Sequence, residues 1–305
     1  MLLACTGGSD RAPASQPDDS ARAPQAARAT GPAPADTDDF GAPLPTNAQF
    51  ASHVVSLNPA ATEAIYAIGA QARLVGRSRW DKYPVEVEQV PALGDGIRPA
   101  VEAILAAKPT LVILYATAEN RSAAEALTRA GIRTMALRVD RIAQFHSQLR
   151  ILGVALGAEA QAQAVSDSVQ RTLDRVRALT ASVRERPSVV WPVWNTPPMV
   201  IGGGSYMDEL LEIAGARNVF HDQPQPSPTV SMEEVIARAP QFVVVSHKQV
   251  TELGANDSWS SLPAVKTKRF VLHDPAVTGR PSVVLGMAAV QLARRLHPTL
   301  ADSLR

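Results

Sequence analysis

The pattern of apolar and polar positions repeats once along the chain, in residues 101–114 and again in residues 232–245. Each copy opens with a short helical stretch that carries Glu at its second position, breaks at Pro109 or Pro240, and continues as an aliphatic run. Such a run, uncharged and rich in β-branched residues, predicts a strand buried on both faces, as in a parallel sheet. An αβ unit that occurs twice predicts two α/β lobes of similar build, and a cleft between two lobes is a common ligand site.

The elements around each repeat support this plan. In the first lobe, a strand over residues 53–57 precedes a helix that Asn58 caps and Gly69 ends. In the second lobe, a strand over residues 189–193 precedes a helix that ends in the same way at Gly215. The two halves therefore begin alike, as expected for a duplicated fold.

One long helix is predicted between the lobes, because apolar residues recur there every three or four positions. At this length it would span roughly 40 Å, enough to reach from one lobe to the other. The predicted fold is two Rossmann-like α/β lobes, residues 53–157 and 187–305, joined by a single long backbone helix, residues 158–186.

The N-terminal residues suggest a lipid anchor. Residues 1–5 end in Leu-Ala-Cys, the pattern of a lipobox, and Cys5 is the only cysteine of the chain. The charged start and most of the apolar stretch of a signal peptide are missing, so we interpret residues 1–5 as a remnant of one. The alternative is an ordinary N-terminus with a stray thiol. Residues 6–52 contain few large apolar side chains, which predicts a disordered tether.

Composition and motifs exclude several classes of protein. The formal net charge is +1 and no basic stripe is present, which argues against nucleic acid as a partner. No uncharged run approaches the ~20 residues of a membrane span. The six histidines lack the spacing of a zinc site. Residues 202–205 lack the lysine of a P-loop, so we interpret them as a tight turn before a helix. We expect a binding protein without catalytic group, metal or cofactor.

Aromatic residues mark the expected ligand site. Aromatics make up only 5% of the chain, yet several of them stand at or just after the ends of predicted strands. That edge of an open α/β sheet is where ligands bind, and aromatic side chains suit a flat, largely apolar ligand. Polar residues that follow strands join the set, although a plain loop histidine is the alternative for His247, and a core position for Trp194. The expected ligand-binding residues are Asn58, Trp80, Tyr83, Tyr115, Trp194, Ser246 and His247.

Glu102 and Glu233 open the two repeated helices. The helix dipole stabilises a carboxylate at this position, and this alone would account for the presence of either glutamate. The repeat would nevertheless place one on each lobe as a symmetric acidic pair. Such a pair could dock on the basic patches of a dimeric partner.

Several phrases of the chain, in this order, resemble the periplasmic binding proteins of iron-complex and cobalamin ABC importers. The resemblance runs from about residue 53 to the C-terminus and implies two α/β lobes whose backbone helix restricts hinge motion. It also implies a monomer in the periplasm or cell envelope, lipid-anchored if Cys5 is acylated. Its partner would be an ABC permease dimer of the inner membrane, which Glu102 and Glu233 would dock. The phrases are residues 54–63, 81–84, 102–114, 202–220 and 230–234.

Within this family the chain looks most like the cobalamin-binding branch, which implies cobalamin or a related corrinoid as the transported ligand. The loop at Asp81, Tyr115 and residues 194–198 support that branch. A departure is Ser227, which stands between two prolines where the branch has a tryptophan. A ferric siderophore or haem therefore remains an alternative ligand. The alternative of another class is a two-lobed α/β enzyme, such as a nucleotide-sugar transferase, against which the missing nucleotide motif argues.

Overall fold

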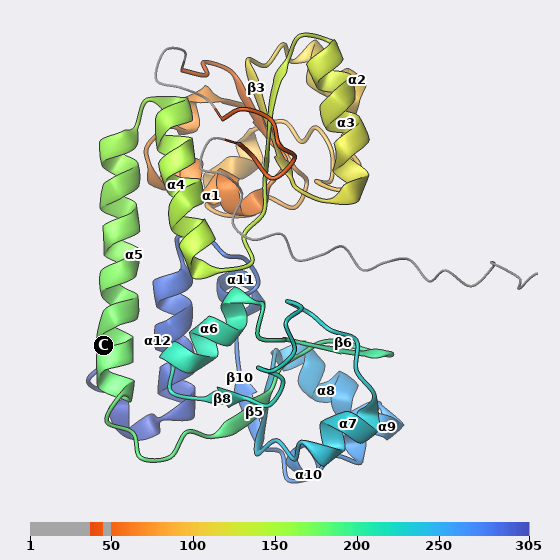
Figure 1. The fold of residues 1–305 in the computed structure, drawn as a ribbon, viewed down its shortest axis with the longest axis vertical. Helices are drawn as coiled ribbons and strands as arrows, with labels where there is room; N and C mark the ends of the chain where they lie inside the picture. The colour runs from red at the N-terminus through yellow and green to blue at the C-terminus, as the bar shows by residue number, and fades with distance from the viewer. Residues whose placement is uncertain (1–36, 45–49, 305) are drawn as a thin grey trace, which may run out of the picture.

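The computed structural model describes residues 37–44 and 50–304, and Cys5 lies outside these ranges. Figure 1 shows two α/β lobes, one above the other, with the long helix α5 (Glu159–Thr180) along one side of both. This arrangement confirms the predicted fold.

The first lobe is built on a four-stranded parallel sheet with the strand order β2-β1-β3-β4. Its central strands are wholly buried apart from Tyr115 at the end of β3, as the aliphatic runs of the sequence predicted. The elements are β1 (Val54–Ser56), α1 (Pro59–Ala67), β2 (Leu74–Arg77), α2 (Val101–Ala106), β3 (Leu111–Tyr115), α3 (Ala118–Arg129), β4 (Arg133–Leu137) and α4 (Ile142–Leu156).

The second lobe repeats this plan in a parallel sheet with the order β8-β5-β9-β10, and adds a β6–β7 hairpin. Its strands are β5 (Ser188–Val190), β6 (Pro192–Asn195), β7 (Pro198–Val200), β8 (Arg217–Asn218), β9 (Phe242–Val245) and β10 (Phe270–Leu272). Its helices are α6 (Tyr206–Ile213), α7 (Met232–Ala237), α8 (His247–Ala255), α9 (Asp257–Ser260), α10 (Pro263–Lys266), α11 (Pro275–Thr278) and α12 (Leu285–Leu296).

The internal repeat extends to the backbone. Just before the repeated strands, Lys108 and Ala239 adopt left-handed conformations with φ of 47° and 46°. After α1 and α6, Gly69 and Gly215 do the same with φ of 75° and 79°, the usual way for glycine to end a helix. Positions paired by sequence therefore have the same local geometry, and the two lobes are structural copies.

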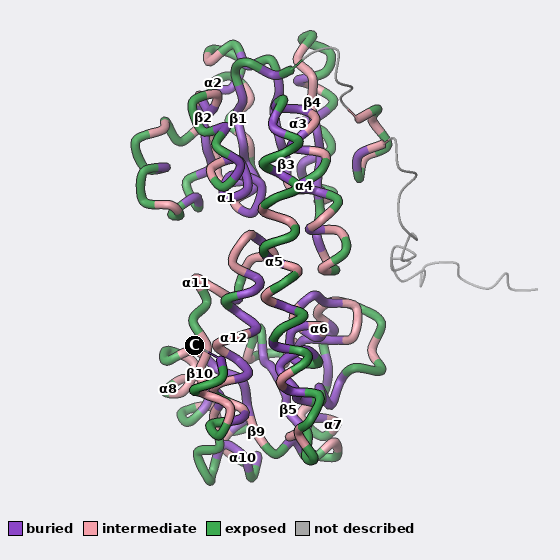
Figure 2. The backbone as a smooth tube through the Cα atoms, turned by 90° about the vertical axis from the view of Figure 1, so that its left-hand side faces the viewer, coloured by how far each residue is buried: buried purple, intermediate pink, exposed green. Residues whose placement is uncertain are grey.

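Helix α5 holds the lobes together. It packs on α4 of the first lobe and on α12 and α6 of the second, and it buries Val169, Leu173 and Val176 of the predicted apolar stripe. Figure 2 shows it in front of both lobes. Near its C-terminus the Thr180 hydroxyl donates a hydrogen bond of 2.8 Å to the Ile213 carbonyl at the end of α6. Helix α5 is shorter than the helix predicted over residues 158–186, but it packs on elements of both lobes.

Residues 37–44 are ordered, which corrects that part of the tether predicted over residues 6–52, whereas residues 6–36 and 45–49 lie outside the described ranges. Asp38 is almost fully buried, and its carboxylate accepts a hydrogen bond of 2.7 Å from the Ala136 amide of the edge strand β4. Asp39 accepts one from the Arg138 amide, and the Phe40 ring lies 4.4 Å from the Arg121 guanidinium. Polar contacts fix this segment together with Phe40 and Leu44, which pack against buried core residues. Its low overall hydrophobicity therefore did not predict the order.

Candidate functional site

A cavity of about 220 Å³ lies between the lobes, and we call it the interlobe cavity. Both lobes form it, since its walls come from the start of α1, the end of β3, the middle of α4 and the loop that joins α11 to α12. Its lining residues are Asn58, Pro59, Ala60, Tyr115, Val139, Gln148, Gly279, Arg280 and Pro281.

Asn58 lines the interlobe cavity, but its polar atoms serve the fold. Its side-chain oxygen accepts a hydrogen bond of 3.3 Å from the Ala61 amide at the start of α1. Its amide nitrogen donates one of 3.1 Å to the Leu137 carbonyl at the end of β4. Asn58 therefore stabilises this part of the cavity wall, because its side chain links the start of α1 to the end of β4.

Tyr115 ends β3 and brings a phenol group to the cavity. Burial raises the pKa of Tyr115, and the nearby carboxylates of Asp140 and Asp39 add to the rise against the opposing charge of Arg138. The hydroxyl therefore stays protonated at neutral pH. Within residues 37–44 and 50–304 it makes no hydrogen bond, so it is available to a ligand.

Arg280 is the cationic group of the cavity, and an ion pair holds it in place. Its Nε atom donates to Oε1 of Glu63 at 2.6 Å, while the hydroxyl of Ser282 donates to the other carboxylate oxygen. Glu63 lies on α1 of the first lobe and is only 5% exposed. The pair therefore crosses from one lobe to the other and orients the guanidinium toward the cavity wall.

A second ion pair joins the lobes at the start of α4. Arg141 lies 2.7 Å from the Glu209 carboxylate of α6 and also donates to the Gly203 carbonyl at 2.6 Å. The same carboxylate accepts from the Ile142 amide at 2.7 Å. Two buried or half-buried contacts of this kind, together with α5, restrain the lobes against each other.

The loop after β2 carries two exposed aromatic residues, Trp80 and Tyr83, which are 58% and 49% exposed. The Tyr83 ring centre lies 5.3 Å from the Arg280 guanidinium, which places this ring at the rim of the interlobe cavity. Asp81 anchors the loop, since its buried carboxylate accepts from the Ser78 amide at 2.6 Å. Burial raises the pKa of Asp81 to about 6.

Trp194 is not part of the interlobe cavity. It is 63% exposed on β6, and its indole nitrogen donates to the Thr196 carbonyl at 2.9 Å. It lines a separate hollow of about 510 Å³ beside α8. Trp194 and Tyr115, both expected at the ligand site, therefore line different cavities, and the exposed Trp194 is not a core residue either. Trp191, by contrast, is a core residue at 3% exposure.

Ser246 and His247 also lie apart from the interlobe cavity. Ser246 caps α8, where its hydroxyl accepts from the Gln249 amide at 3.3 Å and the Gln249 side chain accepts from the Ser246 amide. His247 follows as an exposed first residue of the helix. Both residues line a further cavity at the edge strand β10.

Glu102 and Glu233 are exposed in the first turns of α2 and α7. Among the described residues neither carboxylate has a hydrogen bond or ion pair. Figure 1 shows α2 and α7 on the side of the molecule opposite α5, one on each lobe. The geometry thus offers two free carboxylates from equivalent helices of the two lobes.

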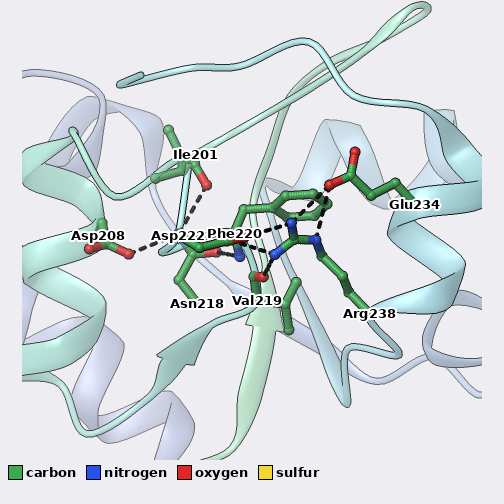
Figure 3. Close-up of polar contacts among 8 residues, drawn as sticks. All are labelled: Ile201, Asp208, Asn218, Val219, Phe220, Asp222, Glu234 and Arg238. Carbon is green, nitrogen blue, oxygen red and sulfur yellow. Dashed lines mark hydrogen bonds and ion pairs between the residues drawn. The ribbon is translucent and has the colours of Figure 1, made fainter. Parts of the chain in front are cut away.

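Arg238 fixes the position of α7, a role that sequence reasoning missed (Figure 3). Its guanidinium pairs with Asp222 and Glu234 and donates to the Val219 carbonyl. It also lies 4.4 Å from the centre of the Phe220 ring. The first repeat has Ala107 at the matching position, so nothing in the repeat itself indicated this anchor.

The described ranges contain no group of three or more His, Cys, Asp or Glu side chains placed to hold a metal ion. Of the helices in the same ranges, none combines the length and apolar character that crossing a membrane requires. The described groups that face the interlobe cavity are suited to binding, with one cation, one neutral phenol and aromatic rings.

Comparison with known proteins identifies the family. Residues 54–277 match the family model described as periplasmic binding protein. The uncharacterized ABC transporter substrate-binding lipoprotein YvrC of Bacillus subtilis strain 168 is 29% identical over 254 residues, covering 80% of each chain. The vitamin B12-binding protein of Yersinia pestis (strain Pestoides F) is 28% identical over 250 residues, covering 82% of this chain and 88% of that protein.

Solved structures show the same fold. A periplasmic haem-binding protein from Pseudomonas aeruginosa superposes with a TM-score of 0.73 at 24% identity, covering 82% of this chain and 94% of that chain. Proteins of this family are substrate-binding components of ABC importers with small-molecule ligands. The family match covers most of the described chain, and the chain accordingly belongs to the periplasmic binding protein family.

Proposed function

We propose that this protein captures cobalamin or a related corrinoid between its lobes and delivers it to an ABC permease. The observation that carries the proposal is the interlobe cavity, which joins Tyr115 and Arg280 from opposite lobes, with the exposed ring of Tyr83 at its rim and exposed Trp80 in the same loop as Tyr83. Exposed aromatic groups beside a cavity are typical of binding sites rather than of free surface.

The interlobe cavity is too small to enclose a corrinoid, so the proposal requires that part of the ligand lies outside the cavity. Drug-sized ligands occupy roughly 300–1,000 Å³, which is more than the 220 Å³ between the lobes. A corrinoid would place one edge in the interlobe cavity and lay its flat ring against Trp80 and Tyr83. The relative named as a vitamin B12-binding protein supports this ligand class.

Haem is the second candidate, and one contact favours it. Tyrosine is a known axial ligand of haem iron, and Tyr83 stands next to Arg280, a guanidinium suited to a carboxylate of the haem edge. A structural neighbour is named as a haem-binding protein. Cobalamin and haem are both coloured, so titration of the purified protein followed by absorbance distinguishes them.

We further propose that Glu102 and Glu233 dock the protein on its permease. They are exposed, unpaired among the described residues, and carried by equivalent helices on one side of the molecule. A permease dimer offers two equivalent basic patches, one for each carboxylate. Charge pairs of this kind set encounter rate and orientation more than affinity.

A lipid on Cys5 would keep the protein at the membrane of the cell envelope. The lipobox-like residues before Cys5 and the lipoprotein name of one relative support this anchor. Detergent-phase partitioning of the protein from its native host tests it. The wild type is expected in the detergent phase and Cys5→Ala in the aqueous phase, whereas equal partitioning would contradict acylation.

A further inference from the structure

A second cavity, of about 740 Å³, lies at the edge strand β10 of the second lobe, and we call it the β10-edge cavity. It shares no lining residue with the interlobe cavity. Three elements enclose it: the first turn of α8, the segment that follows β10, and the last turns of α12. The side chains that carry the argument are His247, Lys248, His273, Asp274, Arg294 and Arg295.

The wall of this cavity has an excess of positive charge. Lys248, Arg294 and Arg295 face a single carboxylate, that of Asp274, which already accepts from the Ala276 amide at 2.9 Å as the cap of α11. Lys248 pairs with Glu252 at 3.1 Å in solvent. Within the described ranges neither Arg294 nor Arg295 makes a hydrogen bond or an ion pair. Two guanidinium groups are therefore uncompensated at one cavity.

Two nitrogen atoms of this wall are buried without a partner, Nε of Arg294 and Nε2 of His273. Buried polar atoms are nearly always hydrogen-bonded, so these two are polar groups that the described protein leaves unsatisfied. His273 adds no positive charge to this wall at neutral pH. Its Nδ1 lies 2.7 Å from the Thr278 hydroxyl, and burial against Trp191 lowers its pKa to about 4.

We propose that the β10-edge cavity binds a phosphate-bearing solute, held by Arg294 and Arg295. The planar guanidinium pairs with phosphate oxygens through two parallel hydrogen bonds, which a lysine cannot do. The first turn of α8, at Ser246 and His247, adds the positive end of a nine-residue helix to the same wall. The volume is larger than one phosphate needs and suits a phosphorylated small molecule.

Calorimetric titration of the full chain with inorganic pyrophosphate tests the proposal. Saturable one-to-one binding is expected, at least about tenfold weaker in Arg294→Gln with Arg295→Gln. The matched control, Arg129→Gln with Lys266→Gln, removes the same charge from exposed positions elsewhere and should retain the affinity within about twofold. Absence of saturable binding, or an equal loss in the control, would overturn the proposal.

Arg295→Gln alone guards against a folding defect, because Arg295 is exposed and its replacement leaves the core untouched. It should weaken pyrophosphate binding at least about threefold with an unchanged melting temperature. An unchanged affinity in this variant would remove Arg295 from the site and contradict the proposal.

The same phosphate chemistry occurs in free solutes and in lipid headgroups, and vesicles separate the two. Co-sedimentation with phosphatidylglycerol vesicles that pyrophosphate displaces assigns the site to a headgroup. Pyrophosphate binding without co-sedimentation assigns it to a soluble compound. If pyrophosphate does not bind, the proposal fails whatever the vesicles show.

Discussion

The Glu63 carboxylate on α1 and the Arg280 guanidinium before α12 meet at 2.6 Å and join the two lobes. The two residues lie 217 positions apart in the chain, and Ser282 donates to the same carboxylate. Because Glu63 is buried, the pair is sheltered from solvent, and the loss of either partner leaves a charge without compensation. This contact also holds Arg280 at the interlobe cavity.

Replacing Glu63 by Ala should lower the free energy of unfolding by about 2–4 kcal/mol, since it leaves the Arg280 cation and the Ser282 hydroxyl without their acceptor. Chemical denaturation measures this loss. Glu125→Ala is the control, because it removes an exposed ion pair to Arg129 and should cost less than about 1 kcal/mol. Equal losses in the two variants would show that the interlobe pair contributes no more than a surface contact.

Replacing Trp80 by Ala should weaken binding of the transported ligand several-fold and leave the melting temperature nearly unchanged. The side chain is 58% exposed, so it contributes little to the core, whereas stacking on a flat ligand is worth roughly 0.5–1.5 kcal/mol beyond area burial. Met287→Ala, an exposed apolar residue on α12, is the control and should keep full affinity. An unchanged affinity in Trp80→Ala would exclude this ring from the site.

Asp81→Asn should stabilise the protein at pH 7 relative to the wild type, and the difference should shrink on acidification. Burial raises the pKa of Asp81 from 3.8 to about 6, so the native state binds this proton more tightly than the unfolded state does. Asp81 therefore lowers the free energy of unfolding of the wild type by about 2–3 kcal/mol as pH rises from about 4 to 6. The asparagine oxygen still accepts from the Ser78 amide.

Unfolding free energies of wild type and Asp81→Asn at pH 4 and pH 7 check this prediction. The difference between variants is the informative quantity, because His273 acts in the opposite direction. Its lowered pKa makes the protein lose stability as pH falls below about 6.5. A difference that is the same at both pH values would mean that Asp81 has an ordinary pKa.

The double change Glu102→Arg with Glu233→Arg should abolish transport, because it turns two attractions to a permease into two repulsions. Ligand affinity in solution should stay within about twofold, since both residues lie away from the interlobe cavity. Glu125→Arg with Glu159→Arg reverses the same number of exposed charges and should leave uptake unchanged. Normal uptake by the first pair, or equal loss in both, would reject these residues as docking groups.

The two lobes could be predicted from the sequence because local patterns of apolar residues and prolines specify their elements. The aliphatic runs of β3 and β9, with Pro109 and Pro240 before them, specify a helix, a break and a buried strand without reference to the rest of the chain. The apolar stripe of α5 is equally local. Residues 37–44 were missed because Asp38 and Asp39 order them through hydrogen bonds to β4, a partner that hydrophobicity does not reveal.

The site was less accessible to sequence reasoning, because equivalent strand ends in the two lobes serve different cavities. β3 and β9 each lie one strand in from the edge of their sheets. Tyr115 at the end of β3 lines the interlobe cavity, whereas His247 after β9 lines the β10-edge cavity. Arg280 had no local signal, since only the fold brings it to Glu63.

The central claim, capture of a corrinoid between the lobes, is tested most directly by absorbance titration of the purified protein with cyanocobalamin. Haem and a ferric siderophore are titrated in parallel. We predict tight one-to-one binding of cyanocobalamin that weakens at least about tenfold, or ~1.4 kcal/mol, in Arg280→Ala. Haem or siderophore binding at least about a hundredfold tighter than cyanocobalamin, or corrinoid binding that is indifferent to Arg280→Ala, would contradict the account.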